Sequence, residues 1–326
     1  MSRGTVAIAA GGTGGHVFPG LAVAAALQER GWRVVWIGTR GGLEARAVPE
    51  AGLEVAWLEV QGLRGKGRLA AVAAPARVLR AVAAAAAILR RQRVDVVLGM
   101  GGYVAGPAGL AARATRRPLV VHEQNARAGL TNRVLARLAR RVLTGFPGAL
   151  GERGRWVGNP TRARLHEVPS PAARLARREG PPRVLVLGGS QGARALNRGV
   201  PAALAEYAGQ APQVRHQAGT RTLAEAQEAY RSADVAAEVV PFIDDMAEAY
   251  AWADLVIARA GALTVAELAA VGAASVLVPL PWAVDDHQSA NAEQLRRAGA
   301  ARIVPQPALE AGELAGELAG DRKSVV

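Results

Sequence analysis

Ala10-Gly11-Gly12-Thr13-Gly14-Gly15-His16 is the stretch that decides the fold of this chain. It follows an apolar run at residues 5–10 and precedes residues 18–30, where apolar side chains recur at helical spacing. This order predicts a strand, a glycine turn and a helix. Such a turn leaves backbone N–H groups and a helix N-terminus exposed to an anion, and only glycine lets the chain turn so tightly.

An altered copy of this unit occurs about one domain later. Residues 183–187 are apolar, Gly188-Gly189-Ser190-Gln191-Gly192 follows, and helical spacing returns over residues 193–206. Because each unit is typical of a nucleotide-binding domain, two of them predict two facing domains with a substrate cleft between them.

Apolar strands alternate with helical segments in both halves. This pattern predicts an α/β fold with two Rossmann-like domains, each with a parallel sheet and helical crossovers. The expected strands are residues 6–10, 33–37, 94–98, 119–122, 141–144, 184–187, 213–217, 237–240, 254–257 and 275–279. Gly158-Asn159-Pro160 breaks any regular element, so we expect a linker at residues 154–160 and domains at residues 1–158 and 159–326.

A dinucleotide-binding oxidoreductase is the main alternative for a glycine turn after a strand. Neither turn fits G-x-G-x-x-G, and the expected strand at residues 33–37 ends in Gly38-Thr39-Arg40. An Asp or Glu that would hold a ribose is missing there. A single glycine turn can also serve only to reverse the chain. The two turns together favour a nucleotide-linked substrate over a redox dinucleotide.

Length and composition exclude several classes of protein. The 326 residues suffice for two domains with separate cores. The chain has no cysteine, which excludes a disulfide framework, a thiolate nucleophile and a thiolate metal site. We expect neither a secretory signal nor a membrane-spanning helix, because no basic stretch with a following apolar region begins the chain and no uncharged run approaches about 20 residues.

The net charge of +13 is unevenly distributed along the chain. Residues 1–160 carry 23 Lys and Arg against 8 Asp and Glu, whereas the remaining residues carry 17 against 19. A basic first half predicts an anionic partner, which could be nucleic acid, phospholipid or a phosphorylated substrate. Basic residues interleaved with aromatic ones are absent from a chain with 3 Phe, 4 Tyr and 6 Trp, so we do not expect nucleic acid.

A basic segment at residues 62–93 has a character of its own. It begins with a basic glycine loop and continues, from Pro75, as a predicted helix with several arginines. Two interpretations are open: an ordinary amphipathic helix with a solvated basic face, or a patch that binds an anionic membrane surface. The segment contains no aromatic residue, so any insertion would be shallow.

Polar and glycine-rich stretches follow two further strands of the first half. Gly99-Met100-Gly101-Gly102-Tyr103 follows the strand at residues 94–98, and His122-Glu123-Gln124-Asn125 comes at the end of the strand at residues 119–122. The carboxyl ends of parallel strands meet at one edge of the sheet, where open α/β sheets place their sites. The two glycine stretches, Gly11–Gly15 and the one that begins at Gly99, predict a basic pocket large enough for a diphosphate.

The five histidines differ in their surroundings. His16 begins a helix beside the first glycine turn, where the helix dipole disfavours a second positive charge, so we expect a neutral imidazole that can accept a proton or simply hydrogen-bonds the loop. His122 could anchor the end of its strand, and His166 and His216 are interpreted as structural. The pair Asp285-Asp286 before His287 lacks the D-x-D spacing of a metal site, so we expect no metal there.

Glu267 has two possible roles. Thr264 and Glu267 fit the spacing of a capping box, which accounts for both residues. Alternatively, Glu267 accepts hydrogen bonds from the two vicinal hydroxyls of a ribose, with Ser190 and Gln191 facing the phosphates.

With these motifs in this order, the chain resembles the family of peptidoglycan glycosyltransferases that convert lipid I to lipid II. The resemblance runs from Ala10 to about Pro305 and also rests on Phe242-Ile243-Asp244-Asp245-Met246 and Gly261-Ala262-Leu263-Thr264-Val265. It implies a GT-B fold, a C-terminal half that binds UDP-GlcNAc and an N-terminal half that binds lipid I, the undecaprenyl-diphosphate-linked MurNAc-pentapeptide. It further implies a peripheral protein at the anionic cytoplasmic face of the cell membrane and no cofactor.

Residue by residue, the resemblance implies a donor site, an acceptor site and a base. Its donor contacts are Ile243 to uracil through the backbone, Glu267 to ribose, Ser190 with Ala262, Leu263 and Thr264 to the diphosphate, Gln288 to sugar hydroxyls, Arg162, and, across the cleft, Thr13, Gly14, Gly15 and Asn125. The acceptor lies on Gly101, Gly102 and Tyr103. We expect a single inverting displacement in which His16, or else Glu123, removes the proton from the attacking muramyl hydroxyl. A UDP-GlcNAc 2-epimerase of the same fold is the alternative, and the basic first half favours the transferase.

Overall fold

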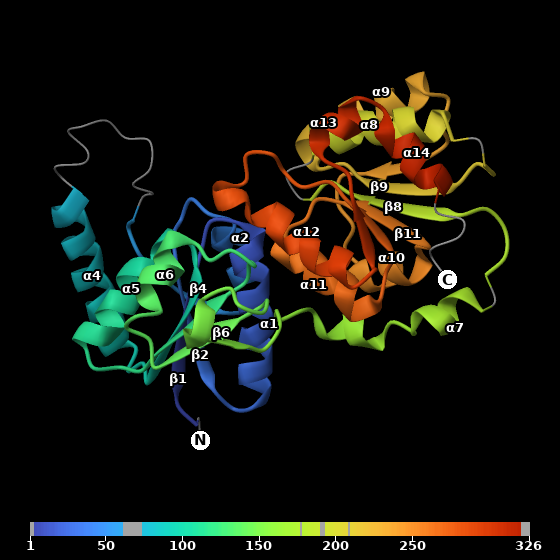
Figure 1. Cartoon of the computed structure of the whole chain (residues 1–326). Coiled ribbons are helices and arrows are strands. Elements are labelled where there is room, and N and C mark those ends of the chain that lie inside the picture. Colours follow the sequence, from blue (N-terminus) through green and yellow to red (C-terminus); the bar gives the residue numbers. More distant parts are fainter. Residues whose placement is uncertain (1–2, 61–73, 177, 190–192, 208, 321–326) are drawn as a thin grey trace. The chain divides into compact units, whose positions relative to one another are not determined.

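The computed structural model describes residues 3–60, 74–176, 178–189, 193–207 and 209–320 (Figure 1). The chain forms two compact units, Met1–Thr161 and Arg162–Val326. Over the described ranges, no helix combines the length and the apolar character needed to cross a membrane.

The first unit is a parallel sheet with helices on both faces. Its strands are β1 (Thr5–Ala10), β2 (Arg33–Gly38), β3 (Glu54–Trp57), β4 (Val96–Gly101), β5 (Leu119–Glu123), β6 (Arg141–Thr144) and β7 (Gly154–Trp156). Its helices are α1 (Gly14–Glu29), α2 (Glu44–Glu50), α4 (Ala74–Arg91), α5 (Gly102–Ala114), α6 (Leu130–Leu135) and the short η1 (Gly151–Arg153). The strand order is β3-β2-β1-β4-β5-β6-β7, and every neighbouring pair is parallel.

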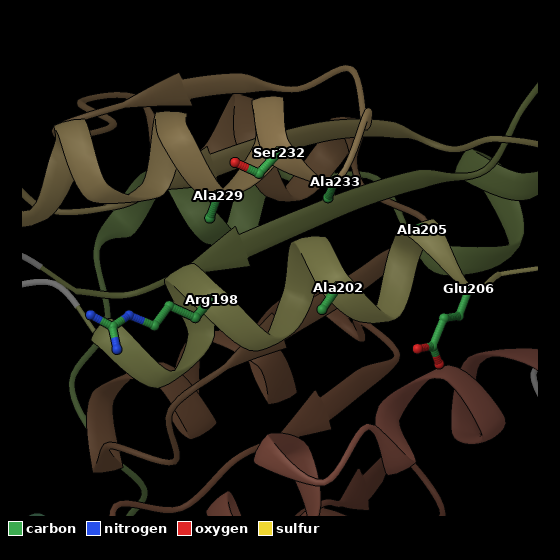
Figure 2. A pocket seen from close by; sticks show the side chains of 7 residues that line it. All are labelled: Arg198, Ala202, Ala205, Glu206, Ala229, Ser232 and Ala233. Atoms are coloured by element: carbon green, nitrogen blue, oxygen red, sulfur yellow. The ribbon is translucent and has the colours of Figure 1, made fainter.

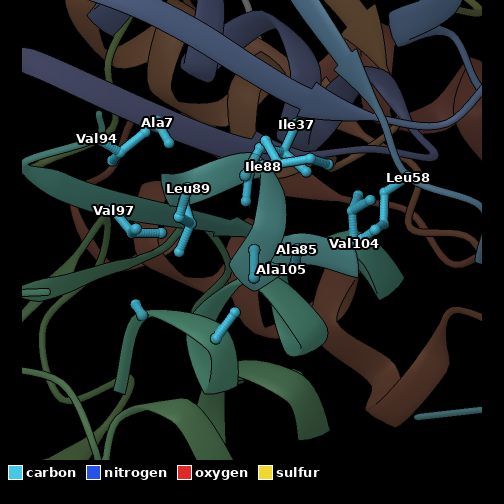
Figure 3. Close-up of a cluster of buried hydrophobic side chains, with 14 of the residues drawn as sticks. Ala7, Ile37, Leu58, Ala85, Ile88, Leu89, Val94, Val97, Val104 and Ala105 are labelled. Atoms are coloured by element: carbon cyan, nitrogen blue, oxygen red, sulfur yellow. The ribbon is translucent and has the colours of Figure 1, made fainter. Parts of the chain in front are cut away.

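Two apolar cores flank this sheet because successive side chains of each strand point to opposite faces. In β1, Ile8 packs with Trp36 and α1 on one face, whereas Ala7 and Ala9 face the helices α4 and α5 on the other. Figure 3 shows the second core, in which Leu89 of α4 lies beside the strand residues. Strands buried on both faces produce continuous apolar runs, which is the signal that predicted this sheet.

The second unit repeats the architecture with six strands. These are β8 (Arg183–Leu187), β9 (Gln213–Gln217), β10 (Glu238–Val240), β11 (Leu255–Ala258), β12 (Ser275–Leu277) and β13 (Ala301–Ile303), in the all-parallel order β10-β9-β8-β11-β12-β13. The helices are η2 (Ala163–Glu167), α7 (Pro171–Leu175), α8 (Arg194–Ala205), η3 (Thr220–Thr222), α9 (Leu223–Ser232), α10 (Met246–Trp252), α11 (Ala262–Val271), η4 (Val284–Asp286), α12 (His287–Arg297), α13 (Gln306–Glu310) and α14 (Glu313–Gly320). The predicted α/β class with two parallel sheets is therefore confirmed.

Several predicted boundaries were wrong. Strand β4 runs to Gly101, so the glycine cluster at residues 99–101 belongs to the strand and not to a following loop. Strand β7 occupies the first part of the expected linker at residues 154–160, and β3 and β13 were not predicted. All three unpredicted strands lie at an edge of their sheet.

His216 lies fully buried in β9, as expected of a structural histidine. Its Nδ1 is 3.1 Å from the Tyr230 hydroxyl, and its Nε2 has no hydrogen-bond partner among the described residues. Burial lowers the pKa of His216 to about 4, because the apolar surroundings disfavour the imidazolium.

We expect this buried imidazole to make the protein acid-sensitive. An unfolded histidine titrates near pH 6.5, so between that pH and about 4 the unfolded chain binds a proton that the folded chain does not. The free energy of unfolding therefore falls as pH falls through this window, by roughly 3 kcal/mol in all. Melting temperatures from pH 7.5 to 4.5 should fall less steeply for His216→Asn, which keeps a polar group beside Tyr230. The exposed His166→Asn is the matched control, and parallel curves for His216→Asn and wild type would contradict the prediction.

Candidate functional site

In each sheet the order in which strands are added changes direction at one point, between two neighbouring strands. Candidate residues follow both of these strands. In the first unit the reversal lies between β1 and β4, where the Gly11–Gly15 turn and the Gly101–Tyr103 stretch begin. In the second unit it lies between β8 and β11, followed by Gly188-Gly189 and by Gly261. Crevices at such reversals are where open α/β sheets bind ligands.

The two glycine stretches of the first unit touch. Gly102 has φ +75°, and a Cβ there would overlap the carbonyl oxygen of Gly11. A Cβ on Gly101, which has φ +100°, would lie 2.9 Å from Nε2 of His16. His16 also lies 3.4 Å, Nδ1 to Oγ1, from Thr13, the residue that precedes α1. The structure thus brings His16, Thr13 and the predicted acceptor stretch together.

Sequence reasoning missed a buried carboxylate beneath this turn. Glu44, at the first position of α2, is 0 % exposed and accepts hydrogen bonds from the Gly12 N–H at 3.0 Å and the Thr39 N–H at 3.1 Å. The Gly12 N–H is therefore already donated within the protein. The predicted diphosphate pocket cannot use that N–H group while this bond persists.

Glu123 is buried at the end of β5 with both oxygens occupied. Its Oε1 accepts from the backbone N–H and the side-chain amide of Asn125, at 2.9 and 3.2 Å. Its Oε2 accepts from the Gly129 N–H at 3.1 Å and the Asn132 amide at 2.9 Å. A carboxylate with four donors that is 2 % exposed shapes the loop at residues 124–129, which fits a positioning role better than proton abstraction.

His122 anchors the end of β5, as one reading of the sequence expected. Its Nε2 lies 3.0 Å from the Gly158 carbonyl oxygen, and its Nδ1 lies 3.3 Å from the side-chain amide nitrogen of Gln124. Burial lowers the pKa of His122, and the bond to Gly158 opposes that shift. The neutral ring, with Nε2–H donating to Gly158, satisfies both neighbours.

In the second unit, Glu267 presents an unused acceptor. The residue is 5 % exposed, and its Oε2 accepts a hydrogen bond from the buried Tyr250 hydroxyl at 3.1 Å. Arg162 Nε lies 3.9 Å from Oε1, which has no hydrogen-bond partner among the described residues. Burial raises the pKa of Glu267, while Arg162 and Tyr250 act in the opposite direction. This oxygen is suited to accept hydrogen bonds from a ligand.

The capping-box interpretation of Thr264 and Glu267 was wrong. Helix α11 begins at Ala262 with Gly261 as its N-cap, a residue without a side chain that could cap the helix. Thr264 and Glu267 therefore lie inside the helix, where the Glu267 side chain reaches Tyr250 instead. Ala262, Leu263 and Thr264 form the first turn of α11, where N–H groups lack helical partners.

Ile243 and Gln288 are already engaged with the protein. The Ile243 N–H donates to Oε1 of the buried Gln217 at 3.2 Å, so a uracil must displace Gln217 or use the Ile243 carbonyl. Gln288, in the first turn of α12, accepts a hydrogen bond from the Leu280 N–H at 3.0 Å. Ser190 lies outside the described residues. The predicted reach of Thr13, Gly14, Gly15 and Asn125 to the donor joins the two units and stays a prediction.

Two cavities lie away from these residues. One of about 380 Å³ lies between α8 and α9 and is lined mainly by small side chains, with Arg198 and Glu206 at its ends (Figure 2). Another, of about 250 Å³, is lined by Pro118 and the four arginines Arg113, Arg116, Arg117 and Arg140. Within the part of the chain that the structure describes, no group of three His, Asp or Glu side chains is placed to hold a metal ion.

Two parallel-sheet units with glycine turns at their reversal points define the class of protein as a GT-B glycosyltransferase fold. Residues 6–144 match the glycosyltransferase family 28 N-terminal domain, and residues 183–323 match the glycosyltransferase family 28 C-terminal domain. The chain belongs to glycosyltransferase family 28.

Similar proteins extend over nearly the whole chain. A relative from Halorhodospira halophila is 69 % identical, covering 99 % of this chain and 91 % of its own length, and one from Alkalilimnicola ehrlichii is 61 % identical, covering 96 % and 88 %. Both are named UDP-N-acetylglucosamine--N-acetylmuramyl-(pentapeptide) pyrophosphoryl-undecaprenol N-acetylglucosamine transferase. The crystal structure of Acinetobacter baumannii MurG is 40 % identical with a TM-score of 0.83, covering 98 % of this chain and 92 % of that one.

Proposed function

We propose that this chain transfers GlcNAc from UDP-GlcNAc to the muramyl sugar of lipid I, giving lipid II. The observation that carries the proposal is the 69 % identity with a relative named for this reaction, over 99 % of the chain. The basic first half supports an acceptor that carries a diphosphate. In this proposal residues 1–158 bind the acceptor and residues 159–326 bind the donor.

The donor is held mainly by the second unit. The Oε1 of Glu267, which has no hydrogen-bond partner among the described residues, accepts hydrogen bonds from the ribose hydroxyls, and the backbone of Ile243 meets uracil. The diphosphate lies against Ser190 and the first turn of α11, whose N–H groups suit an anion. Arg162 and Gln288 complete this site, and Thr13, Gly14, Gly15 and Asn125 contribute from the first unit.

The reaction is a single inverting displacement. The muramyl hydroxyl oxygen forms a bond to the anomeric carbon of GlcNAc as the bond from that carbon to the UDP oxygen breaks. His16 takes the hydroxyl proton, and UDP leaves as an anion held by the second glycine turn and Arg162. We do not assign the base to Glu123, because its two oxygens accept four hydrogen bonds within the protein.

An anionic membrane surface at the cytoplasmic face is the proposed location. Helix α4 buries Ala85 and Leu89 but exposes Arg77, Arg80 and Leu79, the last by 69 %. Exposed arginines around an apolar side chain suit lipid headgroups. The cavity of arginines supports the same proposal, because Arg113, Arg116 and Arg140 form no ion pair with any described residue. Residues 62–73 of the predicted basic segment lie outside the described residues.

The test of this function is UDP release from UDP-GlcNAc in EDTA, with and without a soluble lipid I analogue. We expect release only with the analogue and at the same rate without EDTA, since the proposed chemistry needs no metal. Release without the analogue would indicate hydrolysis or epimerisation. No release together with no binding of UDP would overturn the proposal.

A further inference from the structure

The Glu44 carboxylate binds the loops that follow two strands of the first unit and, through Thr39, reaches the first turn of helix α5. The carboxylate accepts hydrogen bonds from the N–H groups of Gly12 and Thr39. Its Oε1 also accepts a hydrogen bond from the Thr39 hydroxyl, whose oxygen lies 2.7 Å away. The Thr39 hydroxyl is in turn 3.3 Å from the hydroxyl of Tyr103. Gly12 follows β1, Thr39 follows β2, and Tyr103 lies in the first turn of α5 directly after β4. Glu44 and Thr39 thus connect three segments at the carboxyl edge of the sheet.

The backbone around Glu44 is shaped to admit its side chain. A Cβ on Gly11 would lie 2.6 Å from Oε1 of Glu44, one on Gly38 would lie 2.8 Å from its Cγ, and one on Gly42 would overlap the carboxylate. These three glycines enclose a carboxylate that is 0 % exposed. A buried carboxylate costs free energy unless it is hydrogen-bonded, and here backbone and hydroxyl donors supply the bonds.

This arrangement fixes the direction of the hydrogen bond at Tyr103. A threonine hydroxyl has one proton, and Thr39 donates it to Glu44. In the 3.3 Å contact Thr39 must therefore accept, and the Tyr103 hydroxyl must donate. Tyr103 is 37 % exposed, so its hydroxyl oxygen keeps lone pairs to offer a ligand, but its proton is already donated.

We propose that Glu44 is a positioning residue that, through Thr39, makes Tyr103 a hydrogen-bond acceptor and so selects an O–H or N–H group of the acceptor substrate. The inference rests on the proposed function, in which Tyr103 contacts lipid I. It deepens that function, because Tyr103 then meets a hydroxyl or amide of the glycan or its peptide and not a phosphate oxygen, which can only accept.

The decisive variant is Thr39→Val, which removes the connecting hydroxyl at nearly constant volume. The Tyr103 hydroxyl then has no Thr39 acceptor and can donate its hydrogen bond to a ligand. We expect the KM for the soluble lipid I analogue to rise about tenfold, the worth of one hydrogen bond, with the KM for UDP-GlcNAc unchanged. Inorganic pyrophosphate, competing with the analogue at saturating UDP-GlcNAc, should inhibit Thr39→Val more strongly than wild type. If Thr39 had a purely structural role, its replacement would not raise the KM for the analogue while lowering the inhibition constant of pyrophosphate.

Matched variants isolate the network. Thr39→Ser keeps the hydroxyl and should behave as wild type. Glu50→Gln on the same helix should also behave as wild type, since Glu50 is exposed and, among the described residues, pairs with Arg46 alone. Adding Thr39→Val to Tyr103→Phe should raise the analogue KM no further. The proposal is overturned if Thr39→Val changes neither the KM for the analogue nor the inhibition by pyrophosphate while Tyr103→Phe changes them. It is also overturned if Thr39→Val changes the KM values of both substrates in proportion to a fall in melting temperature.

Amide hydrogen exchange separates this inference from the proposed function. We expect protected N–H groups at Gly12 and Thr39 in wild type and faster exchange at both in Glu44→Gln, whose amide cannot accept from both loops. This measurement needs no transferase activity. Rapid exchange at both positions in a folded wild-type protein would overturn the network even if lipid II is made, whereas protection without any transfer would contradict the proposed function alone.

Discussion

Replacement of Glu267 by alanine is expected to lower kcat/KM for UDP-GlcNAc by roughly 10²–10⁴. Two hydrogen bonds from ribose hydroxyls to a charged oxygen, at about 1.5–3 kcal/mol each, account for that range. The geometry supports the size of the effect, because Oε1 of Glu267 is buried and has no hydrogen-bond partner among the described residues. The affinity for UDP alone, measured by calorimetry, should fall along with activity.

The same carboxylate should make donor binding acid-sensitive. Burial raises the pKa of Glu267, so the group takes up a proton at a higher pH than an ordinary glutamate. A protonated carboxyl cannot accept from both ribose hydroxyls, and the affinity for UDP therefore weakens as pH falls through this raised pKa. The affinity of Glu267→Gln, which has no carboxyl to titrate, should lack this dependence.

Three comparisons make the Glu267 prediction specific. Tyr250→Phe removes the hydroxyl that holds Oε2 and should weaken UDP binding by less than Glu267→Ala. Glu293→Gln, which affects a carboxylate paired with Arg296 and Arg297 on α12, should leave binding unchanged. UDP and 2′-deoxy-UDP should differ strongly for wild type and little for Glu267→Ala. Unaltered UDP binding by Glu267→Ala would remove the residue from the donor site.

The sequence predicted every strand that has two neighbours, but of the four edge strands it predicted only β10 and missed β3, β7 and β13. Central strands such as β1 are buried along their whole length, and their apolar runs are unmistakable. The edge strand β7 has three residues, none of them buried, and the edge strand β13 is half-buried throughout. An edge strand contacts the sheet on one side only, so its composition resembles that of a loop.

The location of the candidate site followed from the sequence, whereas its internal contacts did not. Strand ends are visible as apolar runs that stop, and in parallel sheets those ends coincide. The partners of each side chain depend on packing between distant segments: Glu44 binds the N–H of Gly12 from 32 residues away, and Tyr250 binds Glu267 from the preceding helix. Spacing along the chain carries no signal for such bonds.

The capping box predicted at Thr264 and Glu267 shows that a matching spacing can also predict a contact that the structure does not form. Thr264 and Glu267 have the required spacing, but the helix begins earlier, because Gly261 takes up the extended conformation of an N-cap. The pattern is local, and the start of the helix is set by where β11 ends and the chain turns. Only the structure shows that this spacing is not a capping box here.

Replacement of His16 by alanine is expected to lower kcat by roughly 10²–10⁴, the usual contribution of a general base, with little change in the affinity for UDP. The ring lies against Gly101 in the predicted acceptor stretch, which is where a base for the muramyl hydroxyl is needed. His16→Asn keeps a polar atom near the Thr13 hydroxyl but offers no base, so it should be as slow as the alanine variant. A ring that merely holds the turn would be largely replaced by asparagine.

The pH dependence of kcat distinguishes a base from a substrate contact at this position. A protonated imidazole cannot accept the hydroxyl proton, so kcat of the wild type should fall on the acid side, and the residual rate of His16→Ala should lack that limb. His166→Ala, an exposed histidine of the second unit, is the matched control and should keep the wild-type profile. If His16→Ala retains both its rate and the acid limb, the base lies elsewhere. Glu123 then returns as the candidate, although Glu123→Gln would also disturb the loop at residues 124–129 that its carboxylate holds.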